Sequence, residues 1–123
     1  MRFTWHIRNP KVLASRLPDV VREFRELLPC LPPLAGPGGE GAPLLGRGGV
    51  FFNGVKGQTG EDFSFSPYDL LSEEAHSYPH WWECDTEGKP YALAVATFLL
   101  LARDRAGEVL ELRVAVKAAC GKR

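Results

Sequence analysis

The stretch from Lys89 to Gly107 reads KPYALAVATFLLLARDRAG and decides how the rest of the chain must fold. Between Tyr91 and Ala102, Thr97 is the one polar residue, so the stretch has no face suited to water. An apolar helix of this kind lies either in a membrane or in a protein core, and a bilayer needs about 20 apolar residues. We therefore expect a buried core helix with Pro90 in its first turn. The side chains expected in the core are Leu93, Val95, Phe98, Leu99, Leu100 and Leu101.

Alternating side chains predict a strand near each end of the chain. Phe3, Trp5 and Ile7 alternate with polar residues, and a similar alternation of leucine or valine with charged residues covers residues 109–119. After the first strand, apolar residues recur at helical spacing. Because proline breaks helix interiors, we expect a short turn over residues 11–16 and a helix that begins near Pro18.

The middle of the chain adds two short strands. Residues 50–52 and 63–65 read as a β-hairpin whose tip is rich in glycine. The order strand, helix, strand, strand, helix, strand predicts a single α+β domain over residues 1–123, with the βαββαβ topology of ferredoxin-like (split βαβ) folds. Residues 66–88 form a long excursion before the second helix, with a short helix over residues 69–76. A different α+β arrangement of the same elements is the alternative.

The segment 32–49 interrupts this pattern. Glycine and proline make up eleven of its eighteen residues, which predicts a flexible loop without regular structure. The segment lacks the Gly-Lys-Ser/Thr sequence of a phosphate-binding loop. A linker is therefore favoured over a phosphate cradle, and we expect the loop to be dispensable for folding.

The charges are arranged in three blocks that sum to zero. Residues 1–56 carry eight Lys or Arg and four acids (+4), residues 57–88 carry eight acids and no base (−8), and residues 89–123 carry seven bases and three acids (+4). We expect the acidic block to fold onto its basic neighbours, with an acidic patch for a cation or a basic partner as the alternative. The three widely spaced cysteines and the lack of a leader-like apolar start indicate a reduced, cytoplasmic protein with no membrane segment.

One resemblance covers residues 51–101. The segments Asn53-Gly54, Gly60-Glu61-Asp62-Phe63 and Lys89-Pro90-Tyr91 resemble a bacterial and phage-associated small-protein family. Its members show Phe-Asn-Gly, then Gly-His-Glu-Thr-Phe, then Lys-Pro-Tyr-Asp before an apolar helix. This chain differs from the family at Gly60, where the family has histidine, and at Ala92, where it usually has aspartate. The family has no known activity, so the resemblance implies no function.

Two clusters of polar residues suggest a metal site. His76, His80 and Cys84 are spaced four and four, and Asp85 or Glu87 would complete a zinc site with nitrogen, sulfur and oxygen ligands. Glu61 or Asp62, together with Asp85 and Glu87, would instead suit Mg²⁺. Such a site would make the protein a metal-dependent hydrolase of the phosphodiesterase type that uses acids and histidines of residues 61–87. This enzyme is the alternative function, and the primary expectation is that no cofactor is bound.

The aromatic residues of the same region favour binding over catalysis. Trp81 and Trp82 are neighbours, so in an extended backbone only one indole can face the core. Exposed aromatic side chains are enriched at protein interfaces, whereas residues 57–88 offer no Lys or Arg for nucleic acid. We expect an interaction module with its surface in residues 66–89 and a protein partner of basic character. A nucleotide binder that uses Arg47, Lys56 and the glycines ranks last. The binding residues expected are Tyr78, Trp81, Trp82, Lys89 and Tyr91.

Overall fold

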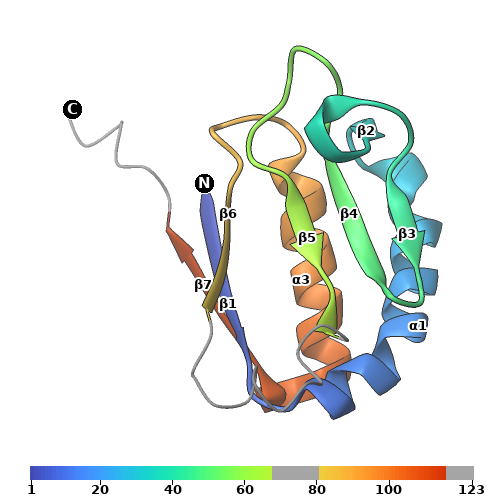
Figure 1. Cartoon of the computed structure of the whole chain (residues 1–123), viewed down its shortest axis with the longest axis vertical. Coiled ribbons are helices and arrows are strands. Elements are labelled where there is room, and N and C mark those ends of the chain that lie inside the picture. Colours follow the sequence, from blue (N-terminus) through green and yellow to red (C-terminus); the bar gives the residue numbers. More distant parts are fainter. Residues whose placement is uncertain (68–80, 116–123) are drawn as a thin grey trace.

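The computed structural model describes residues 1–67 and 81–115, which form an α+β fold with two antiparallel sheets and two long helices (Figure 1). No helix in this part of the chain is long and apolar enough to cross a membrane. The helices are α1 (Pro10–Leu27) and α3 (Ala92–Ala106), with short 3₁₀ turns η1 (Leu28–Cys30), η2 (Pro37–Gly39) and η4 (Gly107–Val109). The strands are β1 (Arg2–Ile7), β2 (Leu34–Ala35), β3 (Leu44–Gly46), β4 (Gly49–Gly54), β5 (Phe63–Phe65), β6 (Trp81–Asp85) and β7 (Leu110–Ala115).

The first sheet has the order β6-β1-β7, with both neighbours antiparallel to β1. A strand near each end of the chain is therefore confirmed within the described residues, and the two strands pair with each other, with β1 central. The alternation in β1 buries Phe3, Trp5 and Ile7 on the inner face. We predicted no strand within residues 66–88, and this was wrong for β6, because its charged and aromatic residues do not show a clean period of two.

The second sheet is built around β4. Strand β5 pairs with β4 through residues 63–65, as the hairpin prediction required. Strands β3 and β2 pair with successive parts of β4, at residues 49–51 and 53–54. The prediction that residues 32–49 form no regular structure is therefore wrong. Glycines in the left-handed region, such as Gly38 and Gly39 with φ of 72° and 84°, turn the chain between β2 and β3.

Helix α1 begins earlier than the sequence suggested. Asn9 caps it by accepting a hydrogen bond from the Val12 amide at 3.3 Å, and Pro10 occupies the first turn. The predicted turn over residues 11–16 and a helix start near Pro18 are wrong, since Pro18 lies inside the helix. Burial of a continuous apolar stripe outweighs the one backbone hydrogen bond that this proline cannot make. The buried residues of the helix are Pro10, Leu13, Ala14, Leu17, Val20, Val21 and Phe24.

Helix α3 is the core helix, but it is not buried all round. It ends at Gly107 with a φ of 67°, as expected for a glycine C-cap. Val95, Phe98 and Leu99 lie in the core, whereas Leu93 and Leu100 are 54% and 63% exposed, so their predicted burial is wrong. The helix packs against α1 and the sheets on one side only, which leaves the opposite side in solvent (Figure 1).

Aromatic rings join the two sheets to the helices. Phe63 lies 5.2 Å from Trp5 in the first sheet and 5.7 Å from Phe98 in α3, measured between ring centroids. Phe24 of α1 stacks on Phe52 of β4 at 5.6 Å. Edge-to-face and tilted ring pairs of this kind stabilise a core beyond the area they bury. One face of the first sheet packs on this shared core, and the other face of that sheet is turned to solvent.

Candidate binding surface

The solvent-facing side of the first sheet, which we call the outer sheet face, gathers polar and aromatic side chains from three strands. Because opposite residues in antiparallel strands project to the same side, the register of β6, β1 and β7 fixes its membership. All of its members are exposed or only partly buried. They are Arg2, Thr4, His6, Trp81, Glu83, Asp85, Glu111, Arg113 and Ala115.

Trp81 is the large apolar side chain on this face. Its indole is stacked with the His6 imidazole at 5.3 Å between centroids, and the Arg113 guanidinium lies 4.5 Å from its ring centroid. A guanidinium at this distance from an indole makes a cation–π interaction. Trp81 nevertheless remains 39% exposed, so an aromatic ring contacted by two planar groups stays open to a partner.

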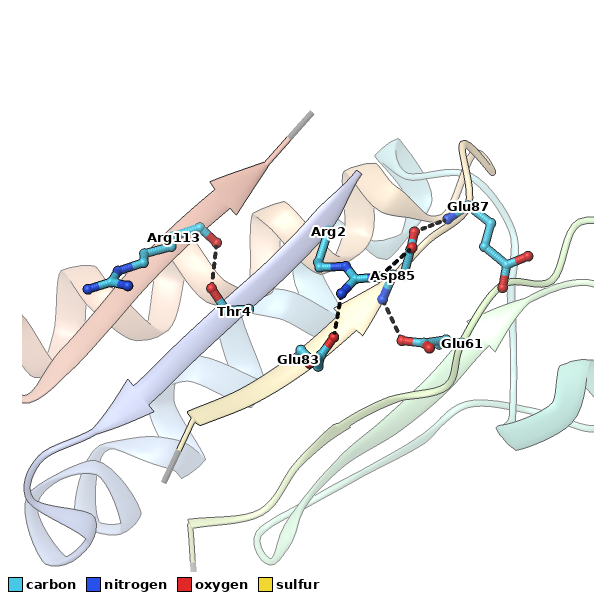
Figure 2. A network of polar contacts seen from close by, with 7 residues as sticks. All are labelled: Arg2, Thr4, Glu61, Glu83, Asp85, Glu87 and Arg113. Carbon is cyan, nitrogen blue, oxygen red and sulfur yellow. Dashed lines mark hydrogen bonds and ion pairs between the residues drawn. The ribbon is translucent and has the colours of Figure 1, made fainter. Parts of the chain in front are cut away.

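Ion pairs lie on the same sheet as the tryptophan. Arg2 donates to Glu83 at 3.0 Å and to Asp85 at 3.3 Å (Figure 2). Arg8, just beyond β1, contacts Glu111 at 2.6 Å. Exposed pairs such as these contribute at most about 1 kcal/mol each. Glu83 and Asp85 belong to the acidic block, and Arg2 to the basic one. At these positions the acidic block folds onto its basic neighbour, as expected.

The adjacent Trp82 points the other way. It pairs with Trp5 on the inner face, and its ring is partly buried. A cavity of about 50 Å³ between the sheets is lined by Trp82 with Trp5, Ile7, Phe51, Ser64 and Ser66. The expectation that one of the two indoles is exposed is confirmed. The cavity holds little more than a water molecule, so we place the candidate surface at Trp81.

A polar junction closes the gap between the two sheets at the end of β6. The Glu61 amide donates to the Asp85 carbonyl at 3.0 Å, and the Glu61 carboxylate accepts from the Asp85 amide at 2.7 Å. The Tyr91 hydroxyl donates to the Glu61 carbonyl at 2.5 Å, and the Cys84 thiol donates to the same oxygen at 3.5 Å. One residue of the β4–β5 connection thus holds β6 and the start of α3 together.

Burial determines the ionisation of this junction. It raises the pKa of the Cys84 thiol to about 12, although a hydrogen bond with Tyr91 opposes the shift. Burial likewise raises the pKa of Tyr91 well above its usual range. Neither group is therefore ionised near neutral pH. A protonated, buried thiol is a poor nucleophile and a poor metal ligand.

Asp85, in contrast, stays ionised. The Glu87 amide donates to its carboxylate at 2.9 Å, and this hydrogen bond, helped by the Arg2 guanidinium, lowers the pKa of Asp85 (Figure 2). Glu87, which lies in the turn after β6, adopts a positive φ of 54°. Asp85 is thus engaged by Arg2 on the outer sheet face.

A second buried group, Asn53, holds the glycine-rich connection between β4 and β5. Its side-chain nitrogen donates to the Gly60 carbonyl at 2.9 Å and to the Asp62 carboxylate at 2.8 Å. Its side-chain oxygen accepts from the amides of Gly54 at 2.7 Å and Gly60 at 3.1 Å. Asp62 also accepts from the Gly38 amide at 2.7 Å, so the glycine- and proline-rich segment is tied to this connection.

The residues that carry the family resemblance meet at these two polar groups. A Cβ atom at Gly54 would lie 2.0 Å from the Gln58 carbonyl oxygen, and one at Gly60 would lie 2.6 Å from the Tyr91 hydroxyl. Asn53, Glu61 and Tyr91 are hydrogen-bonded around them. Asn53, Gly54, Glu61 and Tyr91 therefore lie where two connections approach closely, whereas Gly60, at which this chain departs from the family, has no room for a side chain.

Among the described metal candidates Glu61 lies beside Asp85, but its carboxylate binds the Asp85 amide, whereas the Asp85 carboxylate faces Arg2 and the Glu87 amide. Cys84 projects into the core and Asp85 projects to the outer sheet face, while His76 and His80 lie outside the described residues. Glu61 points toward β6 and Asp62 points toward Asn53 and Gly38. Within residues 1–67 and 81–115, no group of three His, Cys, Asp or Glu side chains is placed to hold a metal ion.

The predicted binding residues are scattered. Tyr78 and the predicted helix over residues 69–76 lie outside the described part of the chain. Tyr91 is buried in the polar junction, and Lys89 lies beyond the far end of β6 from Trp81. Of the four that the structure describes, Trp81 alone reaches the outer sheet face. His6 and Arg113 were missed as its neighbours, because alternation assigns them to a polar face but cannot show that β6 joins that face.

The nucleotide interpretation relied on Arg47, Lys56 and the glycines. Arg47 lies at an open groove of about 310 Å³ between α1 and the β3–β4 turn, which Arg22 and Arg25 also line. Of these arginines, Arg22 pairs with Asp19 at 3.0 Å, and Arg25 donates to the Leu45 carbonyl at 2.5 Å. Lys56 is not among the residues that line this groove.

Comparison with known proteins gives no relative for this chain. No family model matches the sequence, and no match is found among the curated proteins or the solved structures. The assignment of a function therefore depends on the surface itself.

Proposed function

We propose that this protein is a small interaction module that binds a protein partner through the outer sheet face around Trp81. The observation that supports this most directly is the indole of Trp81, which is 39% exposed and in contact with His6 and Arg113. Tryptophan and arginine are the residue types most enriched in binding hot spots. A ring fixed by its neighbours also loses little conformational entropy when a partner covers it.

The charges around Trp81 favour a protein over a nucleic acid. Arg2 and Arg8 are already paired with acids of the same face. A phosphate backbone would have to displace those carboxylates, whereas a protein surface of mixed charge can pair with both signs. A basic partner segment would meet Glu83 and Asp85, both from the predicted surface of residues 66–89.

The proposal extends to the fold and its setting. The predicted order has residues 50–52 and 63–65 as its middle strands, and both lie in the second sheet, as β4 and β5. The ferredoxin-like fold proposed here instead takes β5 and β6 as the middle strands, in the order β1, α1, β5, β6, α3 and β7, with β2, β3 and β4 as an insertion after α1. The sheet order β6-β1-β7 and the hydrogen bonds between Glu61 and Asp85 support this topology. The free thiols of Cys30 and Cys84 support a reducing, cytoplasmic setting.

Site-specific photo-crosslinking tests the proposed surface. A benzophenone amino acid would replace Glu83 on the outer sheet face or, as a control, Lys56 in the exposed turn after β4. We expect a protein adduct from position 83 and none of the same mass from position 56. In the position-83 protein, Trp81→Ala should remove the adduct, whereas Leu44→Ala, at a side chain 56% exposed on the other sheet, should not. Equal adducts from both positions, or an adduct that survives Trp81→Ala, would contradict the proposal.

A further inference from the structure

The strand β7 forms an edge of the first sheet, and its backbone offers unpaired groups. The Arg8 amide donates to the Val109 carbonyl at 2.7 Å, so this opposite pair is hydrogen-bonded. Hydrogen-bonded pairs alternate along an antiparallel ladder, so Glu111 and Arg113 also direct their backbone groups toward β1. Leu112 and Val114 consequently direct theirs away from β1. No strand within residues 1–67 and 81–115 pairs with that side.

The sequence of this edge is complementary to itself. Residues 110–114 read Leu-Glu-Leu-Arg-Val. When a second copy of this strand runs in the opposite direction, each charged residue faces a residue of opposite charge and each apolar residue faces an apolar one. We propose that β7 pairs antiparallel with β7 of a second copy of this chain, with Leu112 opposite the partner's Leu112. Glu111 then lies opposite the partner's Arg113, and Val114 opposite the partner's Leu110.

Charge selects this register over its neighbours. A shift by two residues in one direction places Glu111 opposite the partner's Glu111, and the shift in the other direction places Arg113 opposite the partner's Arg113. Like charges directly opposite are destabilising, whereas opposite charges stabilise a cross-strand pair. A shift by one residue would turn the apolar side chains of one copy to the other face. The register centred on Leu112 satisfies both constraints.

Exposure along β7 agrees with this pairing. Val114 projects to the inner, apolar face of the sheet and yet is 53% exposed. Exposed apolar edge strands are the places where sheets join. The pairing gives the Leu112 and Val114 amides backbone acceptors and covers Val114. It also joins the two outer sheet faces into one continuous surface, with both copies of α3 on the opposite side.

Charge variants test the proposal. Equilibrium sedimentation should show wild-type protein as a dimer at sub-millimolar concentration. Arg113→Glu places glutamates opposite each other, and Glu111→Lys places basic residues opposite each other, so each variant alone should dimerise about tenfold more weakly or worse. An equal mixture of the two should recover a mixed dimer, because each cross-strand pair again has opposite charges. Each variant chain still lacks its own intramolecular contact in the mixture, either that of Arg113 with Trp81 or that of Glu111 with Arg8. The loss of these contacts therefore cannot explain the recovery.

A backbone variant tests the edge itself. Val114→Pro removes an amide that points away from β1, so it should leave the fold intact and abolish the dimer. Val114→Thr, which keeps the amide, is the matched control and should dimerise. Circular dichroism and thermal melts check that each variant is folded. If the proline variant is unfolded, the mixture of the two charge variants tests the dimer instead. A monomeric wild type, a dimer that Val114→Pro leaves unchanged, or a mixture without mixed dimer would overturn the proposal.

Discussion

Glu61 and Asp85 contact each other twice, through a hydrogen bond from the Glu61 amide to the Asp85 carbonyl and a second from the Asp85 amide to the Glu61 carboxylate. Glu61 belongs to the β4–β5 connection of the second sheet, and Asp85 is the last residue of β6 in the first sheet, 24 positions away in sequence. Sheet pairing ends at β5 on one side and at β6 on the other. This pair therefore bridges the two sheets at the C-terminal end of β6.

Removal of the carboxylate should loosen that bridge. We expect Glu61→Ala to lower the free energy of unfolding by about 1 kcal/mol, the usual contribution of one such hydrogen bond. Glu61→Gln keeps an acceptor oxygen and should lose less. Urea denaturation of the three proteins gives the comparison. An alanine variant as stable as the wild type would mean that water replaces the carboxylate without cost.

Adjacent leucines in α3 offer a matched test of the core. Leu99 is 2% exposed and Leu100 is 63% exposed, so the same substitution samples opposite sides of one helix. Leu99→Ala should cost about 2–5 kcal/mol, and Phe98→Ala a similar amount. Leu100→Ala should stay within about 0.5 kcal/mol of wild type. Similar losses at Leu99 and Leu100 in urea melts would show that both sides of the helix are covered.

Stability should fall at alkaline pH because of Cys84. Burial raises the pKa of this thiol from 9.0 to about 12. Between those values the unfolded chain has released the proton and the folded chain has not, so stability falls as pH rises through this window. The raised pKa of Tyr91 acts in the same direction.

The measurement is urea melts across the alkaline range for wild type and Cys84→Ala, whose slope with pH should be smaller. At mildly alkaline pH, iodoacetamide should label Cys30, which is exposed, and spare Cys84 until denaturant is added. Peptide mapping distinguishes the two cysteines. Rapid labelling of Cys84 in the folded protein would contradict its burial.

Asn53 should be difficult to replace. Its side chain makes four hydrogen bonds in a buried position, so Asn53→Ala leaves several polar groups unpaired. We expect a loss of about 1–3 kcal/mol or more. Asn53→Asp should also destabilise at neutral pH, because it sets a carboxylate against Asp62. The control is Gln58→Ala, an exposed position in the same connection, which should be nearly neutral in thermal melts.

A chelator separates the interaction module from the hydrolase. If a metal ion stabilised the fold, EDTA would remove folding free energy and lower the melting temperature. We expect melts with and without EDTA to coincide, and added Zn²⁺, Mn²⁺ or Mg²⁺ to have no effect. A melt that EDTA lowers, that one of these metals restores and that loses this response in His80→Ala would favour the enzyme.

The sequence predicts the elements with strong periodicity. The alternation of Phe3, Trp5 and Ile7 and the capping glycine Gly107 are local signals, and both proved correct. Pro18 misled the assignment of α1, because tertiary burial overrides a local penalty. The exposure of Leu100 was equally hidden, since a uniformly apolar helix does not show which of its sides meets the core. The strands β2 and β3 depend on pairing with β4, which no local pattern reveals.

The candidate surface was only half predictable. That one of Trp81 and Trp82 is exposed follows from extended geometry alone. Which one is exposed depends on the register with β1, because Trp81 lies opposite His6 and Trp82 lies opposite Trp5. The contact with Arg113 requires knowledge that β6 and β7 flank the same strand. Such long-range pairing cannot be read from the spacing of residues within one segment.

The central position of β1 constrains how the chain acquires its structure during synthesis. Its residues leave the ribosome before any of their partners, since β6 starts at Trp81 and β7 at Leu110. Until those strands emerge, the apolar side of β1 has no sheet to complete. Contacts between segments so distant in sequence form slowly, and exposed strand edges attract other chains meanwhile. We therefore expect nascent chains that stop before β6 to need a chaperone, and the first sheet to form only once nearly the whole described chain is free.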